Sequence, residues 1–489
     1  MGLLSGATDA IRRRGSDASH TSGPPGSPDR GQAPDGKPDD VEILDKEEGS
    51  VLSAMISQLR IGMDLSKITF PTFVLEPRSM LERITDFMAH PELMFKAGQI
   101  QDPKQRLLQV TALILAGWHI KPKGVKKPYN PVLGEFFRCT YTYEDGSEGF
   151  FIAEQVSHHP PISAFFYTSP QNGVVVTGEL KPKSKFLGNS VATIMEGENR
   201  VRLLDRPEDG EYTLTMPNMF ARGILFGKMM LELGDSTAVT CPATHYSCDI
   251  EWKTKGWISG GYNAIAGHVR GPEGSAGEIT GHWDGLMEFK DKGGKKQTLF
   301  DATRAQVRPK TVLPEDQQEA NESRRQWADL TAAIKASDMD AATEAKAKVE
   351  DGQREMARRR ESSGQTHQQR FFQPVGDKWM PKLNLDQLSK DPAELLRAVK
   401  EFIFADSSTA QQPPSATSRP ARSNTGASQA SGLSAQNQPI SPVDSSRHAT
   451  TASIASQDSF ASATSDLPIR ETAPGPPAGP LMTHPPTQY

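Results

Sequence analysis

Apolar residues at helical spacing predict the first element of the folded part of this chain. Leu52, Ile56, Leu59 and Met63 recur with polar residues between them, which predicts an amphipathic helix over Val51–Met63. Such a helix is either an ordinary core-facing helix or a short lid that closes a cavity or presses on a bilayer. Further helices are expected at Ser79–Ala89, Pro103–Ala116, Glu315–Asp338 and Met339–Glu361.

Between the early and late helices the apolar pattern changes to that of strands. Glu135–Tyr143 and Gly149–Glu154 are aromatic and β-branched runs, and the Glu144-Asp-Gly-Ser147 turn between them predicts a hairpin. Many consecutive hairpins predict a large antiparallel meander, which tends to close into a barrel that hides its edges and encloses a ligand cavity. The other expected strands are Val174–Leu180, Val201–Leu204, Tyr212–Met216, Ala238–Trp252, Gly256–Asn263, Glu278–Lys290 and Thr298–Ala302.

Composition divides the chain of 489 residues into three parts. Residues 1–48 are rich in Gly, Pro, Ser and Asp, and residues 405–489 are rich in Ser, Thr, Pro, Gln and Ala. Neither stretch has enough large apolar residues to offset the entropy of ordering, so both are expected to be disordered tails. The folded domain is therefore expected over residues 49–404.

Charge and cysteine content restrict the class of protein. The net charge of −5 gives no reason to expect bulk affinity for nucleic acid. The three cysteines, Cys139, Cys241 and Cys248, form no CxxC pair, which fits a reducing compartment and argues against a zinc framework. No apolar run is long enough to span a bilayer and no signal peptide is recognisable. We expect a cytoplasmic protein that contacts membranes transiently through its own surface.

Two adjacent histidines precede two prolines in Glu154-Gln-Val-Ser-His-His-Pro-Pro161. Proline disfavours helix in the residue before it, so His158 and His159 are expected on a stiff, extended, polyproline-like segment. Paired basic rings on such a segment suit a phosphate better than they suit proton transfer. The alternative is a histidine pair that is merely solvated or lies at the edge of the core.

Two further groups of residues could join such a site. In Lys126-Lys-Pro-Tyr-Asn-Pro131 the prolines force a loop, and Asn130 offers an amide beside the ammonium group of Lys127. On the late helix Lys346, Glu350 and Arg354 lie four residues apart and share one face. The alternatives are a solvated basic turn and an exposed, charge-stabilised helix face.

Enzymatic interpretations find little support in the sequence. It contains no GxSxG elbow, phosphate-binding P-loop or HExxH motif. Ser157 precedes His158, but adjacent side chains on an extended backbone diverge and make a poor nucleophile–base pair. A zinc site at the two histidines would lack a third ligand nearby. We therefore expect neither catalysis nor a metal or cofactor.

The Glu154–Pro161 string resembles the fingerprint of the oxysterol-binding-protein-related lipid-transfer proteins. Lys126–Glu135, Met63–Pro77, Ala116–Gly124 and Lys183–Ser190 are also similar to this family. The resemblance implies an incomplete antiparallel β-barrel around one lipid, with an N-terminal lid at about 51–70 and C-terminal helices at about 315–404. It implies a phosphoinositide headgroup site made of Lys127, Asn130, His158, His159, Lys346, Glu350 and Arg354.

The strings are most similar to a short fungal branch of the family. Its members exchange phosphatidylserine for phosphatidylinositol 4-phosphate between endoplasmic reticulum and plasma membrane, so the resemblance implies residence at membrane contact sites, with the tails as possible tethers. For the serine headgroup it implies Phe70, Lys127, Asn130 and Ser184.

One departure from the family bears on the cargo. Sterol-binding members carry a Gln-Tyr pair near the place of Trp118 and His119, which argues against sterol. Three hypotheses remain open: lipid exchange with phosphatidylserine or sterol as cargo, a lipid-responsive scaffold without net transport, and a hydrolase.

Overall fold

The computed structural model describes residues 42–65, 70–122, 124–226, 228–255, 261–384 and 391–405. The predicted tails 1–48 and 405–489 lie outside the described residues, apart from 42–48 and 405. Residues 42–48 correct the sequence-based boundary, because they form a two-residue strand and the start of a helix. The predicted lid, 51–70, is described except for residues 66–69.

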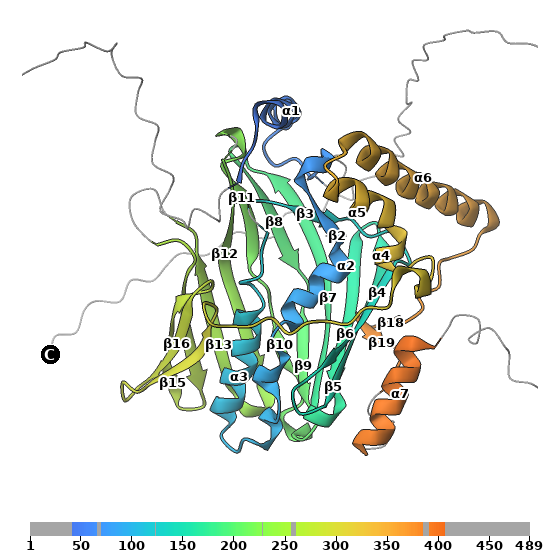
Figure 1. Cartoon of the computed structure of the whole chain (residues 1–489). Helices are drawn as coiled ribbons and strands as arrows, with labels where there is room; N and C mark the ends of the chain where they lie inside the picture. Colours follow the sequence, from blue (N-terminus) through green and yellow to red (C-terminus); the bar gives the residue numbers. More distant parts are fainter. Residues whose placement is uncertain are drawn as a thin grey trace, which may run out of the picture. The chain divides into compact units, whose positions relative to one another are not determined.

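In the described ranges, fifteen strands form one antiparallel sheet that curves around a core (Figure 1). Its main path is β17-β16-β15-β14-β13-β12-β10-β9-β7-β6-β5-β4, while β1, β8 and β11 pair alongside it. β4 and β17 end this path, so the barrel is incomplete, as expected. Two shorter sheets pair β2 with β3 in parallel and β18 with β19.

The strand bounds are β1 Glu42–Ile43, β2 Leu75–Ser79, β3 Lys127–Tyr129, β4 Phe136–Thr142, β5 Glu148–His158, β6 Pro161–Ser169, β7 Val174–Phe186, β8 Ser190–Glu196, β9 Asn199–Leu203, β10 Tyr212–Leu214, β11 Asn218–Arg222, β12 Lys228–Cys241, β13 Tyr246–Lys253, β14 Ala264–Gly271, β15 Gly274–His282, β16 Leu286–Asp291, β17 Lys296–Asp301, β18 Phe372–Val375 and β19 Lys378–Pro381.

Three strand predictions were wrong in their bounds. Ala238–Trp252 is two strands, because the Pro242–Thr244 turn separates β12 from β13. Glu278–Lys290 is likewise divided into β15 and β16 by a tight turn at 283–285. Of Gly256–Asn263, residues 256–260 lie outside the described residues and 261–263 form a turn before β14. Apolar runs continue through these short turns, so hydrophobicity alone does not mark them.

Strand β5 shows why the sheet is apolar on both faces in its first half. Phe151 and Ala153 face the main interior core, while Phe150 and Ile152 belong to a second cluster on the outer face. Helix α7 (Pro392–Phe404) covers this outer face and adds Val399 and Ile403 to that cluster. A sheet buried on both sides has continuous apolar strands rather than alternating ones.

Helix α3 (Pro103–Ala116) has the bounds that the sequence predicts. Asp102 caps its N-terminus by accepting a bond from the backbone of Lys104, and Pro103 occupies the first turn. Most of its residues are buried all round, so the helix packs inside the sheet against β12, β13 and β17. It fills one end of the barrel.

The lid helix begins and ends earlier than predicted. Helix α1 spans Lys46–Ile56, because Asp45 and Glu48 form a capping box at its start. After it the chain turns towards the sheet, where Gly62 N–H donates to Phe186 O at 2.7 Å. Leu52 and Ile56 pack in a lid cluster with Leu65, Val74, Phe186, Ile224 and Met229, and with Phe70 at its edge.

The remaining helices depart from prediction mainly in continuity. The expected helix Ser79–Ala89 is a single turn, α2 (Met80–Arg83), followed by the 3-10 helix η4 (Ile84–Met88). The expected Glu315–Asp338 helix is instead two short helices, α4 (Ser323–Gln326) and α5 (Ala328–Lys335). Helix α6 (Met339–Ser363) was predicted to within two residues, with Asp338 as its N-cap and Gly364 at its end.

Candidate functional site

Packing of β3 against the C-terminal helices brings the predicted basic segments together. β3 runs parallel to β2, with Lys127 opposite Leu75 and Tyr129 opposite Ser79. Tyr129 contacts Trp327, with the ring centroids 5.2 Å apart. Val132, just after β3, shares a cluster with Leu330 of α5 and with Ala342, Ala345 and Val349 of α6.

The carboxylate of Glu135 fixes the loop after β3, although the sequence analysis assigned it no role. It is fully buried and accepts bonds from Ser79 Oγ, Ser323 Oγ, Trp327 Nε1 and the backbone N–H of Val132. Burial raises its pKa, and these donors oppose the rise. Glu135 thus ties the 127–132 loop to β2 and the C-terminal helices.

The histidine pair lies in the turn between β5 and β6. His158 is paired with Pro161 across the hairpin, so the segment is a tight turn and not the predicted polyproline-like strip. The two imidazole centroids lie 4.7 Å apart at an interplanar angle of 71°. His158 is partly buried and His159 exposed. The two rings therefore contact each other in this turn, and their joint binding of a phosphate stays a prediction.

His158 contacts the loop that carries Asn130. Its Nδ1 lies 3.2 Å from the carbonyl oxygen of Pro131. Burial and the nearby His159 ring lower the pKa of His158, while the Pro131 carbonyl and Glu350 oppose that shift. The imidazole is therefore biased towards its neutral form until an anion binds beside it. Asn130 itself is exposed.

Lys127 lies within reach of helix α6. Burial lowers its pKa, Lys346 lowers it further, and Glu350 acts in the opposite direction. The residue nevertheless keeps an exposed surface, so a ligand can reach it. Its Nζ lies 4.8 Å from the ring centroid of Phe70, in cation–π contact.

The charged ladder on α6 forms as its spacing predicts. Lys346 Nζ lies 2.7 Å from Glu350, and Arg354 lies 3.5 Å from the same carboxylate. Lys346 is 18% exposed and Arg354 is 58% exposed, with a second ion pair to Asp351. Lys346 and Glu350 thus lie beside Lys127, while Arg354 is more peripheral and joins the group through Glu350.

Phe70 and Ser184, which were predicted to contact the serine headgroup, lie in different segments of the domain. Phe70 contacts Lys127 and packs at the edge of the lid cluster. Ser184 lies on β7, where its hydroxyl is 3.2 Å from that of Thr193 on β8. Its neighbour Lys185 pairs with Asp64 from the segment after the lid helix. Ser184 is therefore near the segment that follows the lid helix.

Glu154 is a second buried carboxylate that supports the site. It opens the histidine motif and accepts bonds from the backbone N–H groups of Arg370, Phe371 and Phe372 at 2.7, 2.8 and 3.3 Å. Burial raises its pKa. In the sequence, Glu154 and Glu135 are each a carboxylate in or beside an otherwise apolar strand. That pattern could have indicated a buried carboxylate that accepts hydrogen bonds from other segments.

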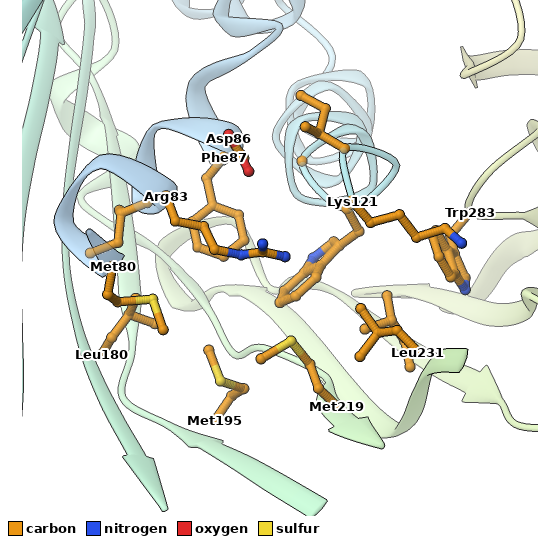
Figure 2. Close-up of a pocket in the computed structure, with 15 residues that line it drawn as sticks. Met80, Arg83, Asp86, Phe87, Lys121, Leu180, Met195, Met219, Leu231 and Trp283 are labelled. Atoms are coloured by element: carbon orange, nitrogen blue, oxygen red, sulfur yellow. The ribbon is translucent and has the colours of Figure 1, made fainter. Parts of the chain in front are cut away.

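A narrow cavity of about 40 Å³ lies inside the barrel (Figure 2). Met80, Leu180, Met195, Met219 and Leu231 supply much of its apolar wall. Ligand pockets usually enclose several hundred Å³, so a lipid chain enters only when these side chains move apart. Methionine suits such a wall because it is flexible and unbranched. β2 leads from the level of Lys127 directly to Met80, which connects the basic site to the cavity.

A family model described as "Oxysterol-binding protein" matches residues 54–387. This chain belongs to the oxysterol-binding protein family. Among curated members, "Oxysterol-binding protein homolog C23B6.01c" from Schizosaccharomyces pombe is 44% identical over 381 residues, 74% of this chain and 78% of that protein. "Oxysterol-binding protein homolog 7" from Saccharomyces cerevisiae is 46% identical over 333 residues, covering 66% and 75%.

Solved structures share the fold of this oxysterol-binding protein family member. The Osh1 ORD domain in complex with cholesterol has a TM-score of 0.60 at 24% identity, covering 75% of this chain and 91% of that one. The Osh3 ORD in complex with PI(4)P, from Saccharomyces cerevisiae, has a TM-score of 0.56 at 21% identity, covering 73% and 93%. The chain thus carries the lipid-binding domain of a family of lipid-binding and lipid-transfer proteins.

Trp118 and His119 lie near the place where sterol-binding members are expected to carry a Gln-Tyr pair. Trp118 lines the cavity, and His119 packs behind it with its Nε2 2.8 Å from Nε2 of buried His90. Burial and the neighbouring His90 lower the pKa of His119 to about 4.

Across the described ranges no helix has an apolar stretch that could cross a membrane.

Proposed function

We propose that the protein exchanges phosphatidylserine for phosphatidylinositol 4-phosphate between the endoplasmic reticulum and the plasma membrane, and that it makes and breaks no covalent bond. The observation that supports the proposal is that Lys127 and His158 both lie close enough to Glu350 on α6 to be influenced by its charge, with Lys346 also near Lys127, in a domain that holds an apolar cavity. A phosphomonoester carries close to two negative charges at neutral pH and matches this excess of cationic groups.

The cavity explains why a carrier is needed. Exposing an acyl chain to water costs about 0.8 kcal/mol per CH₂, so a sixteen-carbon chain costs roughly 12 kcal/mol. An apolar cavity under a lid offsets this cost. Exchange requires that each lipid expel the other, and overlapping headgroup sites that share Lys127 and Asn130 provide that competition. Phe70 and Ser184 are the proposed contacts specific to the serine headgroup.

We propose that this exchange takes place at contact sites between the two membranes, where the protein is peripheral and its tails serve as tethers. The proposed cargo and membranes follow from the resemblance of the sequence motifs to the short fungal branch of the family, and the family itself is shown by the matching family model.

Sterol is the second candidate for the cargo, and one observation favours it. Among the described residues, the indole Nε1 of Trp118 is a buried donor without an acceptor, on a side chain that lines the cavity. A sterol hydroxyl could accept this bond. The Osh1 ORD domain was solved with cholesterol, but at 24% identity this likeness supports only the fold.

A transfer assay between two liposome populations tests the proposal. Donor liposomes carry phosphatidylserine and acceptor liposomes carry phosphatidylinositol 4-phosphate, and both fluxes are followed by lipid-specific fluorescent sensors. The wild-type chain should move both lipids in opposite directions. His158→Ala combined with His159→Ala should abolish phosphoinositide extraction, while the exposed His268→Ala on β14 should have no effect.

The other outcomes of the assay show whether the cargo, the transport or lipid binding itself is wrongly proposed. In a parallel assay ergosterol replaces phosphatidylserine in the donor liposomes, and transfer of ergosterol but not of phosphatidylserine would change the cargo and keep the carrier. Retention of lipid without transfer would favour the lipid-responsive scaffold. Failure to extract any lipid would contradict the proposal.

A further inference from the structure

Arg83 is a cationic side chain in the wall of an otherwise largely apolar cavity. It lies at the end of α2, and Figure 2 shows its guanidinium extending over the cavity, with Met195 and Met219 on the opposite side. Its side chain is 15% exposed. We propose that Arg83 binds the phosphodiester of a diacyl phospholipid inside the cavity and so selects phospholipid over lipids that lack a phosphate. This inference rests on the proposed function, because it requires that the cavity take up lipid.

The order of groups along the protein matches the order of groups along a phosphoinositide. Lys127 is paired with Leu75 at the start of β2, and β2 leads to Met80 and then to Arg83 one turn later. A phosphoinositide places its phosphomonoester first, then the inositol ring, the phosphodiester, the glycerol and the acyl chains. When the phosphomonoester is bound beside Lys127 and the chains lie among the methionines, the phosphodiester falls between them, beside Arg83.

Arg83 shares its carboxylate partner with a second guanidinium group. Glu76 is shared by Arg78 and Arg83, and Asp86 accepts two bonds from Arg78 at 2.8 and 2.6 Å. Arg78 therefore has two carboxylate partners, whereas Arg83 shares its carboxylate Glu76 with Arg78.

The geometry of arginine suits this second contact. A guanidinium has five N–H donors in a planar fork, and the bond to Glu76 is made through Nη1. The other donors remain for oxygens of a bound phosphodiester, which the fork can contact through two parallel bonds. Because Glu76 also pairs with Arg78, replacing Arg83 does not leave a buried carboxylate without a cation. The fold should therefore tolerate the substitution that tests the proposal.

Arg83→Met in the full chain removes the charge and keeps an apolar side chain of similar length. The matched control is Arg304→Met, since Arg304 is 87% exposed and lies outside the cavity lining. Extraction is measured by native mass spectrometry after incubation with vesicles that contain phosphatidylserine or phosphatidylinositol 4-phosphate. Vesicles with diacylglycerol or ergosterol provide the phosphate-free probes. We expect R83M to lose about ten- to a hundredfold in affinity for both phospholipids and to keep its binding of the phosphate-free lipids.

Arg83→Lys distinguishes charge from geometry. Lysine keeps the positive charge but lacks the fork, so phospholipid affinity should fall between that of wild type and that of R83M. Equal phospholipid binding by wild type and R83M would overturn the inference alone. Equal loss of all four lipids in both variants would also overturn it, because Arg83 would then act only on the fold. A wild-type chain that extracts none of the lipids would overturn the proposed function, and the inference with it.

Discussion

The Nδ1 atom of His158 lies 3.2 Å from the carbonyl oxygen of Pro131. This contact joins the β5–β6 turn to the loop after β3, two segments that are 27 residues apart in the sequence. Because Asn130 precedes Pro131, the contact also brings the imidazole to the loop that carries Asn130.

Phosphoinositide binding should depend on pH through His158. Burial and His159 lower the pKa of this imidazole, so in the lipid-free protein it is neutral near pH 7. A phosphate beside it favours the protonated form, and binding therefore takes up a proton. Affinity should increase severalfold as the pH falls from about 8 to about 6.5, and level off below about 6, where the phosphomonoester is protonated. Isothermal titration at several pH values measures this slope, and H158N with H159N should flatten it. An unchanged slope in that variant would contradict the prediction.

Lys346→Met should raise the pKa of Lys127. Burial is the larger cause of the lowered pKa and will remain, but the repulsion from the Lys346 ammonium disappears. Mass-spectrometric detection of pH-dependent lysine labelling can follow Lys127 directly. Lys348→Met is the control, since Lys348 is exposed and pairs with Asp329. An identical labelling profile in K346M and wild type would show that the two ammonium groups do not interact.

Glu42→Gln should loosen the lid. Lys126 Nζ lies 2.7 Å from Glu42 and donates to Phe73 O at 2.8 Å, while Glu42 and Ile43 pair with β12. The ion pair is partly exposed, so its loss should cost about 1 kcal/mol or less, enough to raise the lipid dissociation rate up to about fivefold. Stopped-flow release of a fluorescent lipid measures this rate. Glu47→Gln, an exposed position on the neighbouring lid helix α1, should leave it unchanged. Faster release in both variants would point to the overall charge of the lid instead.

Glu135→Ala should destabilise the fold by about 3–5 kcal/mol, because it leaves several buried donors without an acceptor. Trp327 Nε1 and Val132 N–H lose their acceptor at once. Glu135→Gln keeps one acceptor oxygen and should cost less. Urea denaturation measures both effects. A cost below about 1 kcal/mol for the alanine variant would mean that the loop is held by packing alone.

Acid should destabilise the lipid-free protein partly through His119. Its pKa is about 4 in the fold, against about 6.5 in an unfolded chain. Between these values the unfolded state binds more protons, so stability rises with pH and falls as the pH drops from about 6.5 towards 4. His119→Gln should reduce that loss by about 1–2 kcal/mol, after allowance for partial solvent screening. Urea denaturation at pH 7 and at pH 5 measures the loss of stability in wild type, in H119Q and in the control His268→Gln, a substitution at an exposed position. Equal acid sensitivity of H119Q and wild type would contradict this origin.

The sequence by itself determined the class of fold and the candidate residues of the site. Hairpin turns such as Asp145-Gly146 and the strand periods around them predict a long antiparallel meander, since these signals are local. Helices α3 and α6 were predictable for the same reason, because Asp102, Asp338 and Gly364 mark their ends. The histidine motif, the basic loop and the α6 ladder predicted Lys127, His158 and Lys346 as site residues, from residue type, spacing and family resemblance.

Only the tertiary structure decided how those residues meet. Lys127 and Lys346 are more than two hundred residues apart, and their proximity depends on the packing of α5 and α6 against Tyr129 and Val132. The supporting roles of Glu135 and Glu154 depend on donors from distant segments, which no local pattern encodes. The cavity position of Arg83 likewise depends on how β2 and α2 enter the barrel. Such contacts arise from long-range burial, whereas the sequence pattern records only neighbours along the chain.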